Sequence, residues 1–286
     1  MTGFDTIVVV DWSARSTPSP RRPSKDAIFI AQTTAGQTEV AYHRTRAAAQ
    51  AALEATFDNA LTDGRRVLAG FDFPLGYPKG FAKRLTGTDD PFAVWRWLAE
   101  AIMDGADNSN NRLDVADRIN AAMGGGGPFW SHPKGQTPAQ VPFRKPPHDS
   151  IRFGFAERRG AETIATGAST CFQLFGTGAV ASQTLLGLPR LQQLRDRYEA
   201  KLAVRPFEHR DAPIIVTEVY PSLLTPQIKR RQGPDDIIDA VQVRVLAQAL
   251  AGLPTQRLDA MLGQGCATEG WILGLGHEAE LIAALG

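Results

Sequence analysis

Short apolar runs separated by turns dominate the first part of the chain. Residues 6–10 are β-branched and almost continuously apolar, a pattern that predicts a strand buried on both faces. Residues 26–31 and 38–42 lie on either side of a turn at 35–37 and predict two further strands. Because the connections are short, these three strands are expected to form an antiparallel meander.

Helical and extended patterns alternate in the rest of the predicted core. Large apolar residues recur at every fourth position in the second half of 45–61, which predicts a helix, and 66–72 predicts a fourth strand ended by prolines. Further along, 191–202 predicts a helix, 213–220 a fifth strand and 234–250 a last helix. The sequence therefore predicts an α/β fold with a mixed five-stranded sheet flanked by helices, in which the first, fourth and fifth strands are parallel.

The stretch from residue 80 to residue 178 differs in character from the rest. It is rich in glycine, proline and basic residues, with helical patterns at 91–103 and 111–123. A structureless loop of this length is uncommon inside a compact domain. We therefore interpret 80–178 as a large, partly helical insertion or cap after strand four. It separates a first part of the core at 1–79 from a second part, with a C-terminal tail, at 179–286.

Composition narrows the class of protein. Hydrophobic residues make up 43% of the 286 residues, which is enough for a sizeable core. The formal net charge of +1 gives no global attraction to nucleic acids or membranes. The two cysteines, Cys171 and Cys266, lie far apart, which argues against a zinc site or a disulfide framework. The N-terminal stretch is typical of a strand rather than a signal peptide, so the sequence predicts a cytoplasmic protein without membrane association.

Four acidic residues occupy positions that a sheet edge brings together. Asp11, Asp72 and Glu218 each finish an apolar strand and precede a break in the pattern. Carboxyl ends of parallel strands meet at one edge, which is where sites in such sheets form. Asp239 shares one helical face with the apolar residues of the last helix and is expected to point toward the sheet.

A carboxylate at the end of a buried strand is unfavourable unless it is hydrogen-bonded, paired with a positive charge or bound to a cation. Each acid taken alone is also explained by a hydrogen bond to a loop amide, and Asp235 and Asp236 fit the first turn of the last helix, where acids favour the helix dipole. Several carboxylates without basic partners repel one another, and a hard divalent cation removes that repulsion. The group therefore predicts a Mg²⁺ or Mn²⁺ site that activates water against a phosphodiester.

Five short motifs follow one another along the chain. They are Val8-Val9-Val10-Asp11-Trp12-Ser13, Gly70-Phe71-Asp72-Phe73-Pro74-Leu75-Gly76, Glu218-Val219-Tyr220-Pro221, Asp236-Ile237-Ile238-Asp239-Ala240 and Glu269-Gly270-Trp271-Ile272. In these motifs the chain resembles the DUF429 family, which is classed as predicted nucleases with a ribonuclease H-like fold. The resemblance implies a ribonuclease H-like sheet and an acidic metal site at Asp11, Asp72, Glu218 and Asp239. It implies no substrate.

Other polar residues are candidates for contacts to a substrate. The candidates are Ser13, Asn111, Arg112, His132, Arg144 and Lys145. Arginine and lysine bind phosphates, histidine exchanges protons near neutral pH, and asparagine and serine form hydrogen bonds. Trp130 and Phe143 of the insertion have rings that stack on bases. Helix capping and a solvated loop with aromatic anchors explain the same residues, so both interpretations stay open here.

Three functions are compatible with these residues. The first is a metal-dependent phosphodiester hydrolase, nuclease-like, that acts on nucleic acid or a nucleotide-like phosphate ester. The second is a phosphotransferase or ATPase of the actin and sugar-kinase type, in which Ser13 or Ser16 would donate to phosphate. A single core and the lack of a second glycine-rich phosphate loop argue against it. The third is a non-enzymatic binding protein on the same scaffold. The oligomeric state is not encoded in any pattern seen here.

Overall fold

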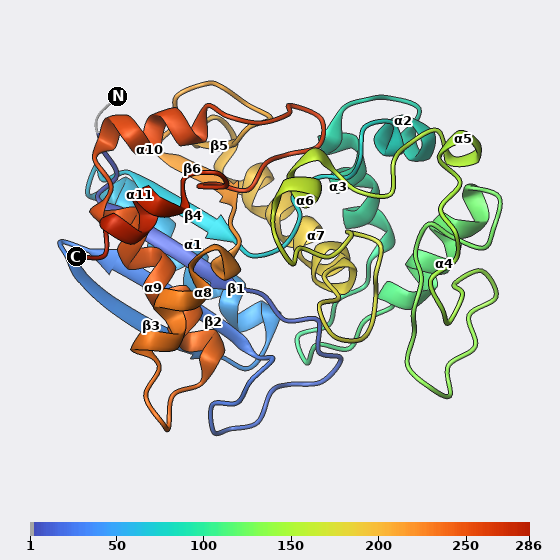
Figure 1. Cartoon of the computed structure of the whole chain (residues 1–286), viewed down its shortest axis with the longest axis horizontal. Coiled ribbons are helices and arrows are strands. Elements are labelled where there is room, and N and C mark those ends of the chain that lie inside the picture. The colour runs from blue at the N-terminus through green and yellow to red at the C-terminus, as the bar shows by residue number, and fades with distance from the viewer. Residues whose placement is uncertain (1–2) are drawn as a thin grey trace.

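A six-stranded mixed sheet lies at the centre of the fold in the computed structural model, which describes residues 3–286 (Figure 1). The strands are β1 (Thr6–Asp11), β2 (Ile28–Thr34), β3 (Gln37–His43), β4 (Val67–Phe71), β5 (Leu202–Val204) and β6 (Ile214–Glu218). Their order in the sheet is β3-β2-β1-β4-β6-β5. β2 is antiparallel to β1 and β3, whereas β1, β4, β6 and β5 are parallel. Residues 1–2 of the predicted first core part lie outside the described residues.

Alternate residues of the central strand lie on opposite faces of the sheet. Val8 and Val10 of β1 belong to one hydrophobic cluster, and Ile7 and Val9 belong to another. The most exposed of the four, Ile7, has only 3% of its surface accessible. Burial on both faces therefore explains the continuous apolar run in this strand.

Helices cover both faces of the sheet. α1 (Arg46–Thr62) and α7 (Ala181–Tyr198) pack on the Val8 side, and α9 (Ile238–Gly252) packs on the Val9 side against β1, β2 and β3. The remaining elements of this half are η1 (Glu199–Lys201), η2 (Pro221–Leu224), α8 (Thr225–Arg231), α10 (Thr255–Leu262) and α11 (Glu278–Ala283). Among residues 3–286, no helix is long and apolar enough to cross a membrane.

The residues between β4 and α7 form a lobe beside the sheet, on the right in Figure 1. Its helices are α2 (Phe81–Thr86), α3 (Pro91–Ala101), α4 (Arg112–Ala122), α5 (Ser150–Phe153) and α6 (Gly160–Ile164). The rings of Phe81, Phe129 and Phe172 pack on one another and continue the hydrophobic cluster of α1 and α7. The partly helical insertion thus shares one core with the sheet. The domain boundaries proposed at residues 80 and 178 stay a prediction.

Two features of the sheet half differ from the expectation. The α/β class is confirmed, but the sheet has a sixth strand, because Leu202–Val204 pair with β6. The helix expected at 191–202 is α7, which begins much earlier, and Gly187 and Pro189 within it obscured its first half. A Cβ on Gly187 would lie 2.2 Å from the ring of Phe73. Glycine at this position therefore lets the chain after β4 pack directly on α7.

Candidate functional site

Asp11 and Asp72 lie side by side at the carboxyl edge of the sheet. Asp11 is the last residue of β1, and Asp72 follows directly after β4, the parallel neighbour. The Asp72 amide donates to the Val10 carbonyl at 3.1 Å, and the Trp12 amide donates to Asp72 Oδ1 at 2.8 Å. Strand pairing and these two backbone hydrogen bonds therefore fix both carboxylates at one edge, as their sequence positions predicted.

Asp239 reaches the same edge from α9. Its Oδ2 accepts a hydrogen bond from the Asp26 amide at 2.7 Å, which ties the first turn of α9 to the start of β2. The last helix was expected to begin at residue 234, but it begins at Ile238, so Asp239 lies within the first turn rather than beyond it. The helix dipole therefore favours the Asp239 carboxylate, as it favours any acid in a first turn. The negative charge of Asp239 also acts on Asp11, so the two carboxyls lie close together.

Burial, and after it the closeness of the acids, raises the pKa values of these carboxyls. Burial, followed by the negative charges of Asp72 and Asp239, raises the pKa of Asp11 well above its usual value. Burial also raises the pKa of Asp72 to about 7, opposed by the hydrogen bonds from Trp12 and from Asp11. Both carboxyls therefore favour the protonated form, and the pair holds a proton near neutral pH. Burial raises the pKa of Asp239 as well, opposed first by the hydrogen bond from the Asp26 amide and then by the charge of Lys25.

Glu218 forms a buried ion pair with Arg159. It ends β6, but its Oε1 and Oε2 each accept a hydrogen bond of 2.7 Å from Arg159, and Oε2 also accepts from the Leu75 amide at 3.0 Å. The side chains of Arg159 and Glu218 are 1% and 4% exposed. This placement disagrees with the prediction that Glu218 belongs to the metal ligands, because a buried arginine already neutralises it and occupies both oxygens.

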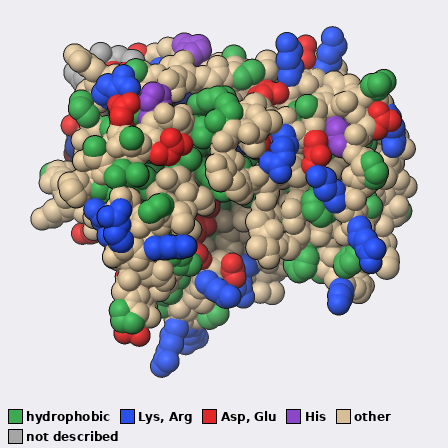
Figure 2. Space-filling model, in the orientation of Figure 1, with side chains coloured by type: hydrophobic (Ala, Val, Ile, Leu, Met, Phe, Trp, Pro, Cys, Tyr) green, Lys and Arg blue, Asp and Glu red, His purple; other side chains and the backbone are tan. Residues whose placement is uncertain are grey.

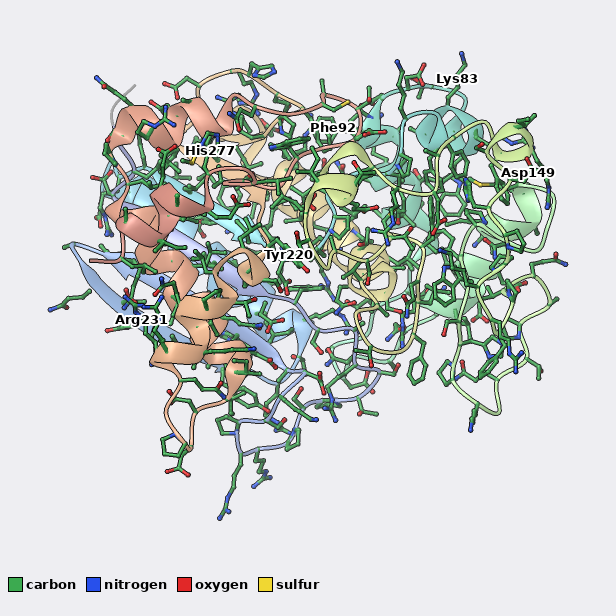
Figure 3. All side chains as sticks on the ribbon, viewed as in Figure 1. Lys83, Phe92, Asp149, Tyr220, Arg231 and His277 are labelled. Carbon is green, nitrogen blue, oxygen red and sulfur yellow. The ribbon has the colours of Figure 1, made fainter. Side chains whose placement is uncertain are left out.

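Arg159 also connects the insertion to the C-terminal tail. Its Nε donates to Glu162 at 2.8 Å, and its Nη1 donates to the carbonyl of Glu269 at 3.1 Å. The Glu269 carboxylate accepts from the amides of Lys79 at 2.7 Å and Gly160 at 2.9 Å. The Glu269-Gly270-Trp271-Ile272 motif therefore holds the insertion against the sheet. Tyr220, which follows β6, lies between the two halves in Figure 3.

The carboxylate oxygens at this edge of the sheet are ligands that suit a hard divalent cation. The arrangement of the acidic side chains suits such an ion only in part. Asp11, Asp72 and Asp239 offer carboxylate oxygens, and neither Asp11 nor Asp72 forms an ion pair with a residue of the described chain. Mg²⁺ and Mn²⁺ prefer such ligands. Within residues 3–286, however, no group of three or more histidine, cysteine, aspartate or glutamate side chains has a metal-holding arrangement. Of the acids at this edge, the Asp11–Asp72 pair therefore fits a divalent cation.

The weaker candidates divide into residues that stabilise the fold and residues that line a cavity. Ser13 is buried and donates to the Asp26 carbonyl at 2.6 Å. Asn111 accepts from the Met103 amide at 2.8 Å and donates to the Ala101 carbonyl at 3.0 Å. Both side chains thus hold loops in place. Asn111 also lines a cavity of about 440 Å³, together with Arg112 and Ser16.

The remaining candidates lie on the outer part of the insertion. His132 packs its ring on Phe143, Lys145 pairs with Glu157 at 2.5 Å, and Arg144 is exposed. Phe143 is 49% exposed, whereas the neighbouring Phe153 and Phe155 rings are buried. Figure 2 shows Lys and Arg side chains dispersed over this face, with acidic side chains inside a central hollow. The basic residues therefore do not form a continuous stripe on this face of the kind that follows a nucleic-acid backbone.

Arg159, Arg46 and Asp26 shape the site but were not recognised as such in the sequence. Arg159 was one of several basic residues of the insertion, and no local pattern links it to Glu218. Arg46 has no exposed surface, and it donates to Asp104 and to the carbonyls of Ser13 and Arg15 at 3.0 and 2.8 Å. It thereby fixes the loop after β1. An arginine at the start of an otherwise alanine-rich helix was the available signal for this role.

Comparison with protein-family models, with curated proteins and with solved structures found no match for this chain. What these observations define is an α/β protein with an acidic site at the carboxyl edge of its sheet. The resemblance to the DUF429 family stays a prediction.

Proposed function

We propose that the chain is a metal-dependent hydrolase of phosphate esters on a ribonuclease H-like core, with its site at Asp11, Asp72 and Asp239. The observation that supports this most is the pairing of Asp11 with Asp72 at the sheet edge without a basic partner in the described chain. An antiparallel meander extended by parallel strands also agrees with the fold that the DUF429 resemblance implies.

The contrast with Glu218 supports the assignment. Glu218 has a buried arginine as counter-ion, so its charge is balanced without a ligand. Asp11 and Asp72 have no such counter-ion in the described chain; burial raises the pKa of Asp72 to about 7, so the pair keeps a proton near neutral pH. A group that holds a proton at neutral pH for lack of a cation exchanges it for one when a cation is present.

Asp11 and Asp72 would hold the ion, with Asp239 as the third acid of the edge. When bound, Mg²⁺ or Mn²⁺ supplies a Lewis acid that lowers the pKa of water and offsets charge on a phosphoryl oxygen. The chain's own residues orient the carboxylates. The Trp12 amide fixes Asp72 Oδ1, and the Asp26 amide fixes Asp239 Oδ2. Both amide hydrogen bonds favour the ionised carboxylates that a cation needs.

The test is hydrolysis of single strands, duplexes and nucleotides by the purified chain with Mg²⁺, Mn²⁺ or EDTA. We expect metal-dependent cleavage that falls by about a hundredfold or more in Asp72→Asn and in Asp11→Asn, the usual loss when a catalytic group is removed. Asp89→Asn is the matched control, since Asp89 is an exposed carboxylate in the loop before α3. Cleavage that survives in EDTA or in Asp72→Asn contradicts the proposal. Nucleotide turnover without cleavage favours the phosphotransferase instead.

A further inference from the structure

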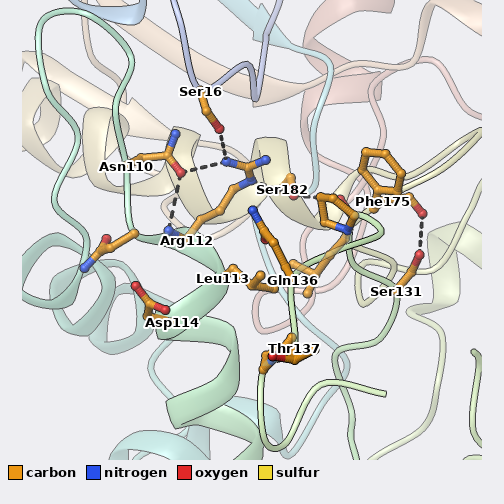
Figure 4. A pocket seen from close by; sticks show the side chains of 14 residues that line it. Ser16, Asn110, Arg112, Leu113, Asp114, Ser131, Gln136, Thr137, Phe175 and Ser182 are labelled. Atoms are coloured by element: carbon orange, nitrogen blue, oxygen red, sulfur yellow. Dashed lines mark hydrogen bonds between the residues drawn. The ribbon is translucent and has the colours of Figure 1, made fainter. Parts of the chain in front are cut away.

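A cavity of about 440 Å³ lies between the loop after β1 and the insertion. Ser16 contributes from that loop, Arg112 from α4 and Ser182 from α7, as Figure 4 shows. Small-molecule sites occupy roughly 300–1,000 Å³. The cavity is therefore large enough for a small ligand and too small for a duplex.

Arg112 in this cavity carries a positive charge that the protein does not neutralise. Its Nε donates to Ser182 Oγ at 3.0 Å, and its Nη1 donates to Ser16 Oγ at 2.8 Å and to Asn110 Oδ1 at 2.7 Å. All three acceptors are neutral, and within residues 3–286 neither an ion pair of Arg112 nor an acceptor for its Nη2 occurs. Burial, followed by the charge of Arg46, lowers its pKa to about 10, so the guanidinium stays charged at neutral pH.

This arrangement differs from that of the buried Arg46 and Arg159. Arg46 pairs with Asp104, and Arg159 pairs with Glu162 and Glu218. Arg112 is held rigidly by neutral groups while two N–H donors on Nη2 stay free. A guanidinium with free donors and no carboxylate is suited to bind an anion, above all phosphate, whose oxygens match its planar geometry.

The rest of the wall adds hydrogen-bonding groups and one exposed ring. Ser131, Gln136 and Thr137 line the cavity with hydroxyl and amide groups, and Phe175 lines it with a ring that is 49% exposed. Asp114, the acid of the lining, is exposed. Arg112 suits an anionic group, and the ring of Phe175 suits a flat group, since bases stack on aromatic rings. A nucleotide has both groups, a phosphate at one end and a base at the other.

We propose that this cavity binds the phosphate of a nucleoside monophosphate or nucleotide end on Arg112, with the base on Phe175. The inference rests on the proposed function for its substrate class, and it names the group that positions the substrate. Ser16 is five positions after Asp11, so the two Cα atoms lie at most about 18 Å apart. The cavity and the acidic edge thus lie at the two ends of one short segment, residues 11–16.

Titration calorimetry with inorganic phosphate and with adenosine 5′-monophosphate, both in EDTA, tests the cavity alone. We expect the wild type to bind both, and Arg112→Gln to weaken both by about tenfold or more, because a charge-assisted hydrogen bond is lost. Phe175→Ala is expected to weaken the nucleotide by about fivefold or more and to leave phosphate unchanged. Arg230→Gln is the control, since Arg230 is exposed on α8, which contributes no residue to this cavity.

Gln136→Glu tests the same cavity with Arg112 in place, so the test does not depend on the folding of Arg112→Gln. Gln136 is exposed and lines the cavity, so the change keeps the shape and places a carboxylate where the anion would bind. We expect it to abolish binding of both probes. No binding by the wild type, or equal binding by Gln136→Glu, overturns the inference.

The proposed function and the cavity inference can be refuted independently of each other. In EDTA, Asp72→Asn is expected to bind adenosine 5′-monophosphate as the wild type does. If binding instead needs Mg²⁺ and disappears in Asp72→Asn, the anion binds at the acidic edge, and the cavity inference is overturned while the proposed function stands. If Asp72→Asn binds normally and no variant or wild type hydrolyses any ester, the cavity inference stands and the proposed function fails.

Discussion

Replacing Asp72 by asparagine is expected to change how the stability of the protein depends on pH. The folded protein raises the pKa of Asp72 from 3.8 to about 7, so between these values the folded state binds more protons than the unfolded chain. The stability that this proton contributes is fully present below about pH 4 and is lost as the pH rises toward about 7. Asparagine cannot titrate, so this loss disappears in the variant.

The expected magnitude follows from the size of the shift. One pKa unit corresponds to about 1.4 kcal/mol, so between about pH 5 and about pH 7 the wild type loses up to about 3 kcal/mol through this group. Asp72→Asn keeps an oxygen that accepts from the Trp12 amide, which limits any structural cost. Relative to the wild type, the variant is therefore expected to gain stability as the pH rises.

Urea unfolding at about pH 5, 6 and 7 in EDTA measures the difference, with Asp89→Asn as the control for removing one negative charge. Parallel curves of unfolding free energy for wild type and Asp72→Asn would refute the raised pKa of Asp72. Adding Mg²⁺ at about pH 7 extends the test. We expect it to stabilise the wild type and not Asp72→Asn, since a ligand stabilises only a state that binds it.

Three other substitutions test the contacts around the site. Glu218→Gln is expected to cost about 3–5 kcal/mol of unfolding free energy, equally in EDTA and Mg²⁺, because it leaves the buried Arg159 with one charged partner fewer; a loss that appears only with Mg²⁺ would restore Glu218 as a ligand. Glu269→Gln leaves one of two exposed backbone amides without its protein acceptor and is expected to cost about 0.5–1.5 kcal/mol and to speed proteolysis in the insertion; unchanged proteolysis would count against its role in holding the insertion. Gly187→Ala places a Cβ 2.2 Å from Phe73 and is expected to cost about 1–3 kcal/mol in urea unfolding, whereas Gly160→Ala, whose nearest atom would be 3.6 Å away, is the control.

The central sheet could be predicted because its signals are local. β1 and β4 are apolar on both faces and bounded by breaks, so their ends, and with them Asp11 and Asp72, followed from the sequence. β5 could not be predicted in the same way. It has only three residues, Leu202–Val204, and it exists because β6 offers an unpaired edge there. Pairing of that kind is a property of the assembled sheet.

The partners of the acids could not be predicted, because they come from distant segments. Arg159 meets Glu218 across 59 positions, and Asp26 meets Asp239 across 213. The position of an acid at the end of a strand predicts that it lies at the edge of the sheet. It does not predict whether a buried arginine pairs with it there. Glu218 and Asp72 have the same local pattern and differ only in this partner. Side-chain pairing across the tertiary structure therefore decides which acids are available to a ligand.

The loop after β1 links the two charge imbalances of the molecule. At its start, Asp11 and Asp72 have negative charge that only a shared proton offsets. At Ser16, the loop contacts Arg112, whose positive charge has no carboxylate partner in the described chain. Arg46 fixes the loop between them by binding the carbonyls of Ser13 and Arg15. Under the proposed function, a phosphate ester bound together with a divalent cation would carry both missing charges, the anion for Arg112 and the cation for Asp11 and Asp72.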